Sequence, residues 1–339
     1  MASAAEEVDL FPSIENAEFL KMFFSQLEKW NMFNIQLNFY VSIVGVFLTV
    51  FHLIVLTRKS MRISSIISIM IVIAMCDLVF MFVAISIKDI VLNHYGTLCT
   101  PSNSLLVHHV YWVLVTFRDY AIRCSTWLTV TLAMIRFLVS KYITSPKLQA
   151  LSSFKVGLQG SIICLLCTNM PLNSTYPYYE HRVLDFFAHG NELPRRMYQV
   201  INGVLVKIAP CIVLPLLTTL LAIELRKTER NRISSRVSTR NNSERTTVLV
   251  IIVTLLIFIA SLPTGTATVF SFIYPDLGFF FLPMNLDAAL HSVLALNGSI
   301  NCFIFYAMSI QYRTTVKHIW IKVNVEGRVA TISNGLHRL

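Results

Sequence analysis

The sequence has 339 residues, of which 55% are hydrophobic and only 14% are charged. This composition excludes a chain made of soluble domains alone, because such domains carry about 25% charged residues. Basic residues exceed acidic ones by 28 to 18, but the excess lies in loops between apolar segments. We therefore expect membrane lipids, and no nucleic acid, as the partner of these charges.

Seven segments are each long enough to cross a bilayer, which requires about 20 mostly apolar residues. In chain order they cover residues 38–56, 63–87, about 111–142, 154–172, about 200–223, 246–272 and about 287–308. The third segment carries three charged side chains in its first half, so it should lie inside the bundle and not face lipid. The sequence therefore predicts an all-α membrane protein with a seven-transmembrane helix bundle.

The basic residues mark one side of this bundle. They are concentrated in the C-terminal tail and in loops 57–62, 141–155 and 224–245. Residues 1–33, by contrast, contain six acidic residues and two lysines. Basic loops are retained on the cytoplasmic side. We therefore expect a multi-pass protein of the plasma membrane with its N-terminus outside and its C-terminus inside.

This orientation divides the chain into three parts. Residues 1–37 form an extracellular N-terminal segment, residues 38–308 form the bundle, and residues 309–339 form a short cytoplasmic amphipathic helix and a tail. The sequon at Asn173 falls outside and is expected to be glycosylated. The sequon at Asn241 falls inside and should stay unmodified.

Two charged side chains inside the predicted spans require a partner or a purpose, because a charge at mid-bilayer costs about 2.5–3.5 kcal/mol. Asp77 lies in the middle of the second span, where it could hold a cation or anchor a polar network; the alternative is a protonated structural acid. Arg136 lies near the cytoplasmic end of the third span. Its alternative is an interfacial arginine that reaches the headgroups.

A second group of polar side chains is expected at the outer end of the bundle. Asp119 and Arg123 are spaced i, i+4, which favours a local ion pair and leaves Arg118 unpaired and available to an anionic ligand group. Other spans add residues that could complete the same ligand site or could simply reach the membrane interface: Lys207, Asp287, His291 and the aromatic Trp112.

Three stretches carry a resemblance to a known family: "TVFHLIVLTRKSMRISSIISIMIVIAMCDLV", "STWLTVTLAMIR" and "SINCFIFYAMSIQYRTT". The chain resembles rhodopsin-like seven-transmembrane G-protein-coupled receptors. More narrowly, it resembles the nematode serpentine chemoreceptors of the Srw class, which are similar to FMRFamide-type neuropeptide receptors. The resemblance covers about residues 38–320. It implies a receptor that senses an extracellular chemical cue or short peptide and signals through a heterotrimeric G protein.

The resemblance also implies roles for particular residues. Asp77 matches a second-helix aspartate that in many members binds sodium and couples the ligand to activation, so a sodium ion is the one cofactor it suggests. The seventh helix supplies the rest of this activation network: Asn297, Asn301 and Phe305. Arg136 matches the arginine that engages the G protein. Ile135 replaces the acid that usually precedes it, so we expect appreciable signalling without ligand.

Amine receptors of this superfamily usually have an aspartate where this chain has Arg118, so the resemblance favours a carboxylate-bearing small molecule or a short peptide. Two other functions stay open, namely a ligand-gated or chemosensory membrane channel and a decayed receptor that no longer signals. Catalysis and metal binding lack support. Cys164 and Cys167 lie in an apolar helix, and the adjacent His108 and His109 point in different directions on a helix.

Overall fold

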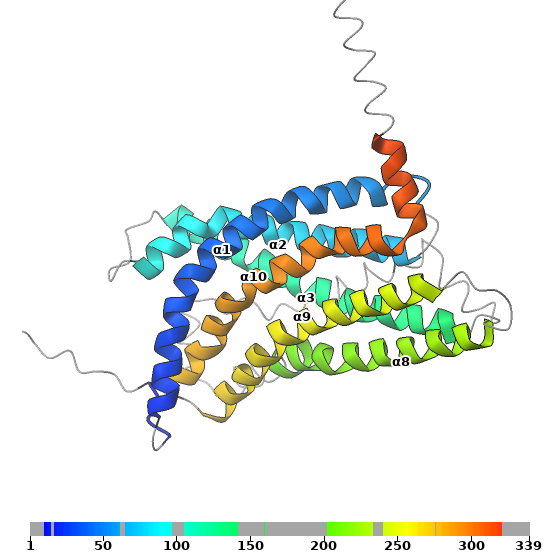
Figure 1. The fold of residues 1–339 in the computed structure, drawn as a ribbon. Coiled ribbons are helices and arrows are strands. Elements are labelled where there is room, and N and C mark those ends of the chain that lie inside the picture. The colour runs from blue at the N-terminus through cyan, green and yellow to red at the C-terminus, as the bar shows by residue number, and fades with distance from the viewer. Residues whose placement is uncertain are drawn as a thin grey trace, which may run out of the picture.

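The computed structural model describes residues 10–14, 17–61, 65–96, 105–141, 159, 202–232, 240–274 and 276–320. All the regular structure in these residues is helical (Figure 1). In chain order the helices are α1 (Glu18–Leu56), α2 (Ser65–Gly96), α3 (Leu105–Lys141), η2 (Asn202–Ile208), α8 (Ala209–Arg232), α9 (Arg240–Ile273) and α10 (Leu277–Met308). η2 is a π-helix that leads directly into α8, and residues 310–320 form one further short helix.

Six helices in the described part of the chain are long and apolar enough to cross a membrane. They overlap six of the seven predicted spans, the fifth of which is formed by η2 and α8 together. α10 begins at Leu277, ten residues before the predicted start of the seventh span. The fourth predicted span, residues 154–172, lies outside the described residues, as does the sequon at Asn173. The chain is thus a helical protein that crosses the membrane several times.

Helices that are neighbours in the chain pack side by side, and the last one returns to the first. α1 packs on α2 and α10, α3 packs between α2 and α8, and α9 lies between the η2–α8 helix and α10 (Figure 1). Small residues allow this close approach. A Cβ atom added to Gly45 of α1 would lie 2.5 Å from Ser299 Oγ of α10 and 2.6 Å from Met81 Sδ of α2.

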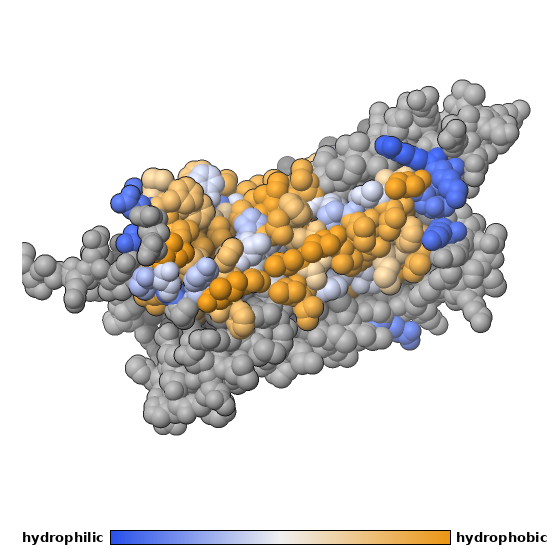
Figure 2. Space-filling view, turned by 90° about the horizontal axis from the view of Figure 1, so that it is seen from below, coloured by the Kyte–Doolittle hydropathy of each residue, from blue (hydrophilic) through white to orange (hydrophobic). Residues whose placement is uncertain are grey.

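The two ends of the bundle are polar and its middle is apolar. The N-terminal end, at the left of Figure 1, carries the starts of α1, α3 and α10, and the C-terminal end, at the right, carries residues 310–320. On the face shown in Figure 2, hydrophobic side chains fill the middle and hydrophilic ones lie at both ends. This distribution is expected where the middle of a bundle contacts lipid.

α1 starts well before the predicted first span. The helix begins at Glu18 and not at residue 38. Charged residues such as Glu28 interrupt the apolar run in the sequence, but they lie only on the exposed side of the helix. The opposite side carries Phe24, which is buried in an apolar cluster with the start of α10. Tertiary packing therefore extends the helix beyond the segment that hydropathy marks.

The segment before α1, residues 10–14, folds onto the start of α10. Phe11 is 1% exposed and lies so close to α10 that a Cβ atom on Gly278 would collide with its ring. The amide and the hydroxyl of Ser13 both donate to the carboxylate of Asp276, at 3.1 Å and 2.5 Å. These contacts attach the beginning of the described chain to the N-terminal end of the bundle.

The short helix of residues 310–320 lies where the sequence predicts an amphipathic helix. Its N-cap is Ser309, whose backbone is extended and whose Oγ accepts a hydrogen bond from the Tyr312 amide at 3.1 Å. One face docks on the loop after α1, where Gln311 Nε2 donates to Ser60 O at 2.8 Å. The other face is exposed and includes Trp320.

Candidate functional site

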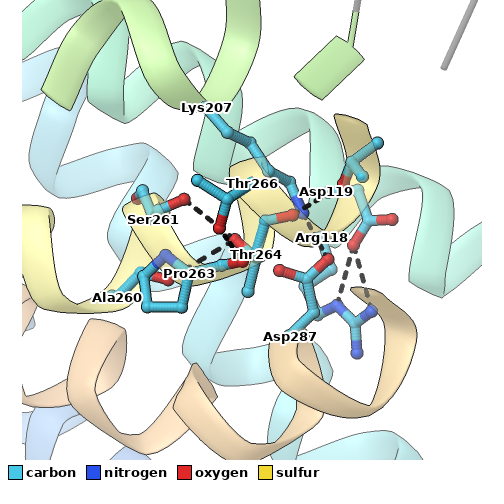
Figure 3. A network of polar contacts seen from close by, with 10 residues as sticks. Arg118, Asp119, Lys207, Ala260, Ser261, Pro263, Thr264, Thr266 and Asp287 are labelled. Carbon is cyan, nitrogen blue, oxygen red and sulfur yellow. Dashed lines mark hydrogen bonds and ion pairs between the residues drawn. The ribbon is translucent and has the colours of Figure 1, made fainter. Parts of the chain in front are cut away.

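Charged side chains from three helices meet near the N-terminal end of the bundle (Figure 3). Lys207 comes from the π-helix η2 and Asp287 from α10, and Lys207 Nζ donates to Asp287 Oδ2 at 2.5 Å. The side chain of Lys207 is 18% exposed and that of Asp287 is 42% exposed. A π-helical turn inserts an extra residue and changes the direction of its side chains, which is why such turns are frequent at functional sites.

η2 also packs closely against α9. A Cβ atom on Gly265 of α9 would lie 2.9 Å from Ile208 Cγ1 and 3.0 Å from Lys207 Cβ. The backbones approach because Gly203 of η2 is a glycine too, and a Cβ there would lie 3.2 Å from Gly265 O. The turn that carries Lys207 is therefore in direct contact with α9.

α3 contributes Arg118 and Asp119 to the same group. Arg118 Nε and Nη2 both donate to Asp119 Oδ1, at 3.1 Å and 3.0 Å. The expectation that Arg118 stays unpaired is therefore wrong. Adjacent residues point about 100° apart on a helix, but the long arginine side chain bends back far enough to reach its neighbour. The pairing of Asp119 with Arg123 stays a prediction.

One of the remaining predicted ligand residues, His291, lies close to these ion pairs. His291 is on α10, one turn after Asp287, and packs against Phe80 of α2 with ring centroids 5.9 Å apart. It lies within electrostatic range of Arg118, Asp119 and Lys207. Arg123 is half-buried, one turn after Asp119 on α3.

Trp112 also lies on α3, but its side chain is outside the described ones. The structure thus brings together five of the seven residues that the sequence suggested, as two ion pairs and a histidine: Arg118, Asp119, Lys207, Asp287 and His291.

A second polar group surrounds Asp77 near the middle of the bundle. Ser125 Oγ of α3 donates to Asp77 Oδ1 at 2.8 Å, and Asn301 Nδ2 of α10 donates to Asp77 Oδ2 at 3.4 Å. Gly298 allows this approach, since a Cβ there would lie 3.1 Å from both Cβ and Cγ of Asp77. The carboxylate therefore links α2, α3 and α10.

The oxygens near Asp77 fit the sodium ion that the resemblance suggested. Hard cations prefer oxygen ligands, and Asp77 and Ser125 supply a carboxylate and a hydroxyl. Asn297, one turn before Asn301 on α10, has a buried Oδ1 atom that accepts no hydrogen bond from the described residues. A buried acceptor without a donor is rare, and a cation would satisfy it.

Arg136 lies near the end of α3, at the C-terminal end of the bundle. It is half-buried, and within the described part of the chain it makes no hydrogen bond or ion pair. The preceding Ile135 packs against the largest apolar cluster. The residue before Arg136 is therefore not an acid that could pair with its guanidinium.

These features agree with one family. The family model described as "Serpentine type 7TM GPCR chemoreceptor Srw" matches residues 36–166 and 165–322, which together cover most of the chain. The chain belongs to the Srw family of serpentine chemoreceptors. No curated protein sequence matches it significantly. The Srw match also runs through residues 154–172, where the sequence predicts the fourth span.

One further buried group in this Srw chain was not predicted from its sequence. Tyr312 of the short C-terminal helix is fully buried, and its hydroxyl lies 3.0 Å from His52 Nδ1 of α1 and 3.6 Å from Cys302 Sγ of α10. Burial raises the pKa of this hydroxyl, so it keeps its proton. Phe305 of the predicted activation network packs beside both rings, with centroids 5.3 Å from His52 and 6.1 Å from Tyr312.

The sequence contained a partial signal for this group. A histidine in an apolar span should have a polar partner, because an unsatisfied polar group in hydrocarbon costs several kcal/mol. The partner itself could not be found from spacing, since it lies beyond α10 in a segment that turns back toward α1.

Proposed function

We propose that this Srw chain is a G-protein-coupled receptor of the plasma membrane that senses an extracellular small molecule or short peptide and signals through a heterotrimeric G protein. The observation that carries the proposal is the separation of two features along the bundle. A cluster of ion pairs lies near the N-terminal end, and a half-buried Arg136 without an ion pair to any described residue lies near the C-terminal end. Recognition at one end and coupling at the other is the function that this arrangement supports, and we assign no catalytic residue.

The proposed orientation places the N-terminal end outside the cell. It rests on the basic sequences that follow the ends of α1, α3 and α8, and on the acidic first 33 residues. In this orientation Arg136 faces the cytoplasm, Asn173 is on the glycosylated side, and the exposed face of residues 310–320 meets the inner leaflet.

The charges of the cluster restrict the ligand. Arg118 and Lys207 are each neutralised by an acid, so a carboxylate that binds either base displaces Asp119 or Asp287. The displaced acid then needs a new cation, because an unpaired, partly buried charge is unfavourable. A ligand that carries both a carboxylate and an amino group satisfies both halves of an opened pair. We therefore narrow the expected carboxylate ligand to a zwitterion such as an amino acid or a short peptide.

The same contacts suggest how binding is coupled to activation. Lys207 lies on the turn that packs directly against Gly265 of α9, so a ligand that moves Lys207 away from Asp287 also acts on α9. Pro263, two residues before Gly265, is a position where a helix bends. In the receptors that this chain resembles, the helix that corresponds to α9 swings outward and frees the arginine that Arg136 matches for the G protein. A sodium ion at Asp77 would stabilise the state in which α2, α3 and α10 stay together.

A reporter of G-protein dissociation in cells tests the proposal. Amino acids and dipeptides, simple carboxylates and simple amines are applied at equal concentration, and zwitterions are expected to activate. For the active zwitterion, Lys207→Ala should weaken potency by about 10-fold or more, because a hydrogen bond to a charged group contributes about 1.5 kcal/mol or more even where the pair is only partly buried. Lys88→Ala is the matched control, since Lys88 pairs weakly with the exposed Asp89 at 4.0 Å. Equal potency in the two variants would remove Lys207 from the ligand site.

A further inference from the structure

One flank of α1 is apolar and uncovered along nearly the whole helix. Its large side chains follow one another at intervals of three or four residues, apart from one gap of seven between Phe23 and Trp30. They are between 37% and 72% exposed: Phe19, Phe23, Trp30, Phe33, Leu37, Tyr40, Val44 and Phe47. Spacing of this kind keeps side chains on one face of a helix. In the second half of α1, inside the predicted first span, this face is exposed and apolar as expected for contact with lipid, and it continues on the same side into the first half.

α1 is too long to lie entirely across the membrane. Its 39 residues make a helix of about 58 Å at 1.5 Å per residue, whereas the hydrocarbon core is about 30 Å thick. Figure 1 shows that the first part of α1, drawn in dark blue, turns away from the direction of the rest and passes along the start of α10, at the end of the bundle where α9 ends. The apolar flank of residues 18–36 is therefore near the membrane surface and not in the bilayer centre.

This first part of α1 has three distinct flanks. One is buried against the bundle and carries Phe24, Leu27, Asn31 and Asn34. A second is polar and exposed and carries Lys21, Ser25, Glu28 and Lys29. The third is the apolar flank, which Gln26 interrupts once. A helix with one packed, one polar and one apolar flank is suited to the boundary between protein, water and lipid.

Hydrogen bonds fix the rotation of this part of α1 about its axis. Asn31 Nδ2 donates to Asn285 Oδ1 of α10 at 2.9 Å, and Asn34 Oδ1 accepts from the hydroxyl of Ser292. Nearer the start of α1, Phe24 and Leu27 are buried in an apolar cluster with the start of α10. Because both ends are held, the apolar flank cannot turn inward toward the bundle.

We propose that residues 18–36 form an interfacial helix whose apolar flank is inserted into the headgroup region of the leaflet at the N-terminal end, the outer leaflet in the proposed orientation. Phenylalanine and tryptophan are typical of this depth. The segment contains two glutamates and two lysines, Glu18, Lys21, Glu28 and Lys29, so it carries no net charge. Zwitterionic phospholipid is therefore sufficient, and anionic lipid is not required. The insertion does not depend on the ligand or on the G protein.

Spin labels on the full-length chain in phosphatidylcholine nanodiscs test this placement. Single cysteines replace Phe23 and Trp30 on the apolar flank, Ser25 and Lys29 on the polar flank, and Val44 as the lipid-facing reference. The unsubstituted chain gives the background, and the native cysteines in its described part are all buried. Collision with oxygen, which partitions into lipid, is compared with collision with a water-soluble nickel complex.

The proposal expects the ratio of oxygen to nickel accessibility to be highest at position 44, intermediate at positions 23 and 30, and several-fold lower at positions 25 and 29. Equal ratios on the two flanks would overturn the proposal, because both flanks would then be in water. Spin–spin broadening at positions 23 and 30 that requires two chains per nanodisc would overturn it in another way, since a second copy would then cover the flank. Neither outcome bears on G-protein coupling.

Discussion

Without the buried hydroxyl of Tyr312, the short C-terminal helix should detach from the bundle more often. In Tyr312→Phe, His52 Nδ1 loses the partner that lies 3.0 Å away. His52 Nε2 already has no partner among the described residues, so the ring would keep no hydrogen bond there. An unsatisfied buried polar group costs about 1–3 kcal/mol, which corresponds to a roughly 5- to 150-fold more frequent opening of the group.

Cys302 supplies the assay for this prediction, because its thiol is buried 3.6 Å from the same hydroxyl. The rate at which a thiol reagent modifies Cys302 in the folded receptor reports local opening, and mass spectrometry identifies the modified residue. Tyr312→Phe should raise this rate by the same roughly 5- to 150-fold. Tyr306→Phe is the matched control, since Tyr306 is 47% exposed and should leave the rate unchanged.

The double variant His52→Leu/Tyr312→Phe separates this explanation from a general loss of packing. Replacing both polar partners by apolar groups is nearly neutral when the shapes fit. The thiol of Cys302 should therefore be modified more slowly in the double variant than in Tyr312→Phe alone. An unchanged rate in Tyr312→Phe, or a double variant that opens more often than either single one, would refute the reasoning.

Three further predictions concern other parts of the chain. Gly265→Ala should destabilise the receptor by about 1–3 kcal/mol, because the new Cβ would press on the turn of Lys207; an unchanged thermal midpoint in a thiol-reactive dye assay would contradict this. Sodium chloride, compared with choline chloride, should raise that midpoint in the unaltered chain but not in Asp77→Asn; an equal rise in both would exclude sodium binding at Asp77. Glycosidase should shift the mobility of the expressed chain, and only Asn173→Gln should abolish the shift, whereas loss in Asn241→Gln alone would invert the proposed orientation.

The predicted spans were accurate where hydropathy alone decides the structure. The six spans that fall in the described part all overlap helices, because a bilayer-spanning segment must satisfy its backbone hydrogen bonds internally. The start of α1 was missed by hydropathy. Glu28 and its neighbours interrupt the apolar run, and only packing against α10 shows that the helix continues through them.

The residues of the candidate site could be predicted from the sequence, but the ion pairs between them could not. Charged residues in apolar spans indicate a buried site, and the structure brings five of them together. Which base meets which acid depends on the relative rotation of three helices and on the π-helical turn that directs Lys207. That turn has no sequence signature of its own, and Arg118 pairs with its immediate neighbour, a contact that helical spacing disfavours.

Nucleotide exchange by a purified G protein tests the central claim most directly. The receptor is reconstituted in nanodiscs without ligand, and the binding of a non-hydrolysable GTP analogue is followed with each class of heterotrimeric G protein. The unaltered chain should accelerate exchange with at least one class. Arg136→Ala should abolish the acceleration, and Lys141→Ala, an exposed base at the same end of α3, should preserve it. Exchange no faster than with empty nanodiscs in every class, or equal exchange in Arg136→Ala, would contradict the proposed coupling.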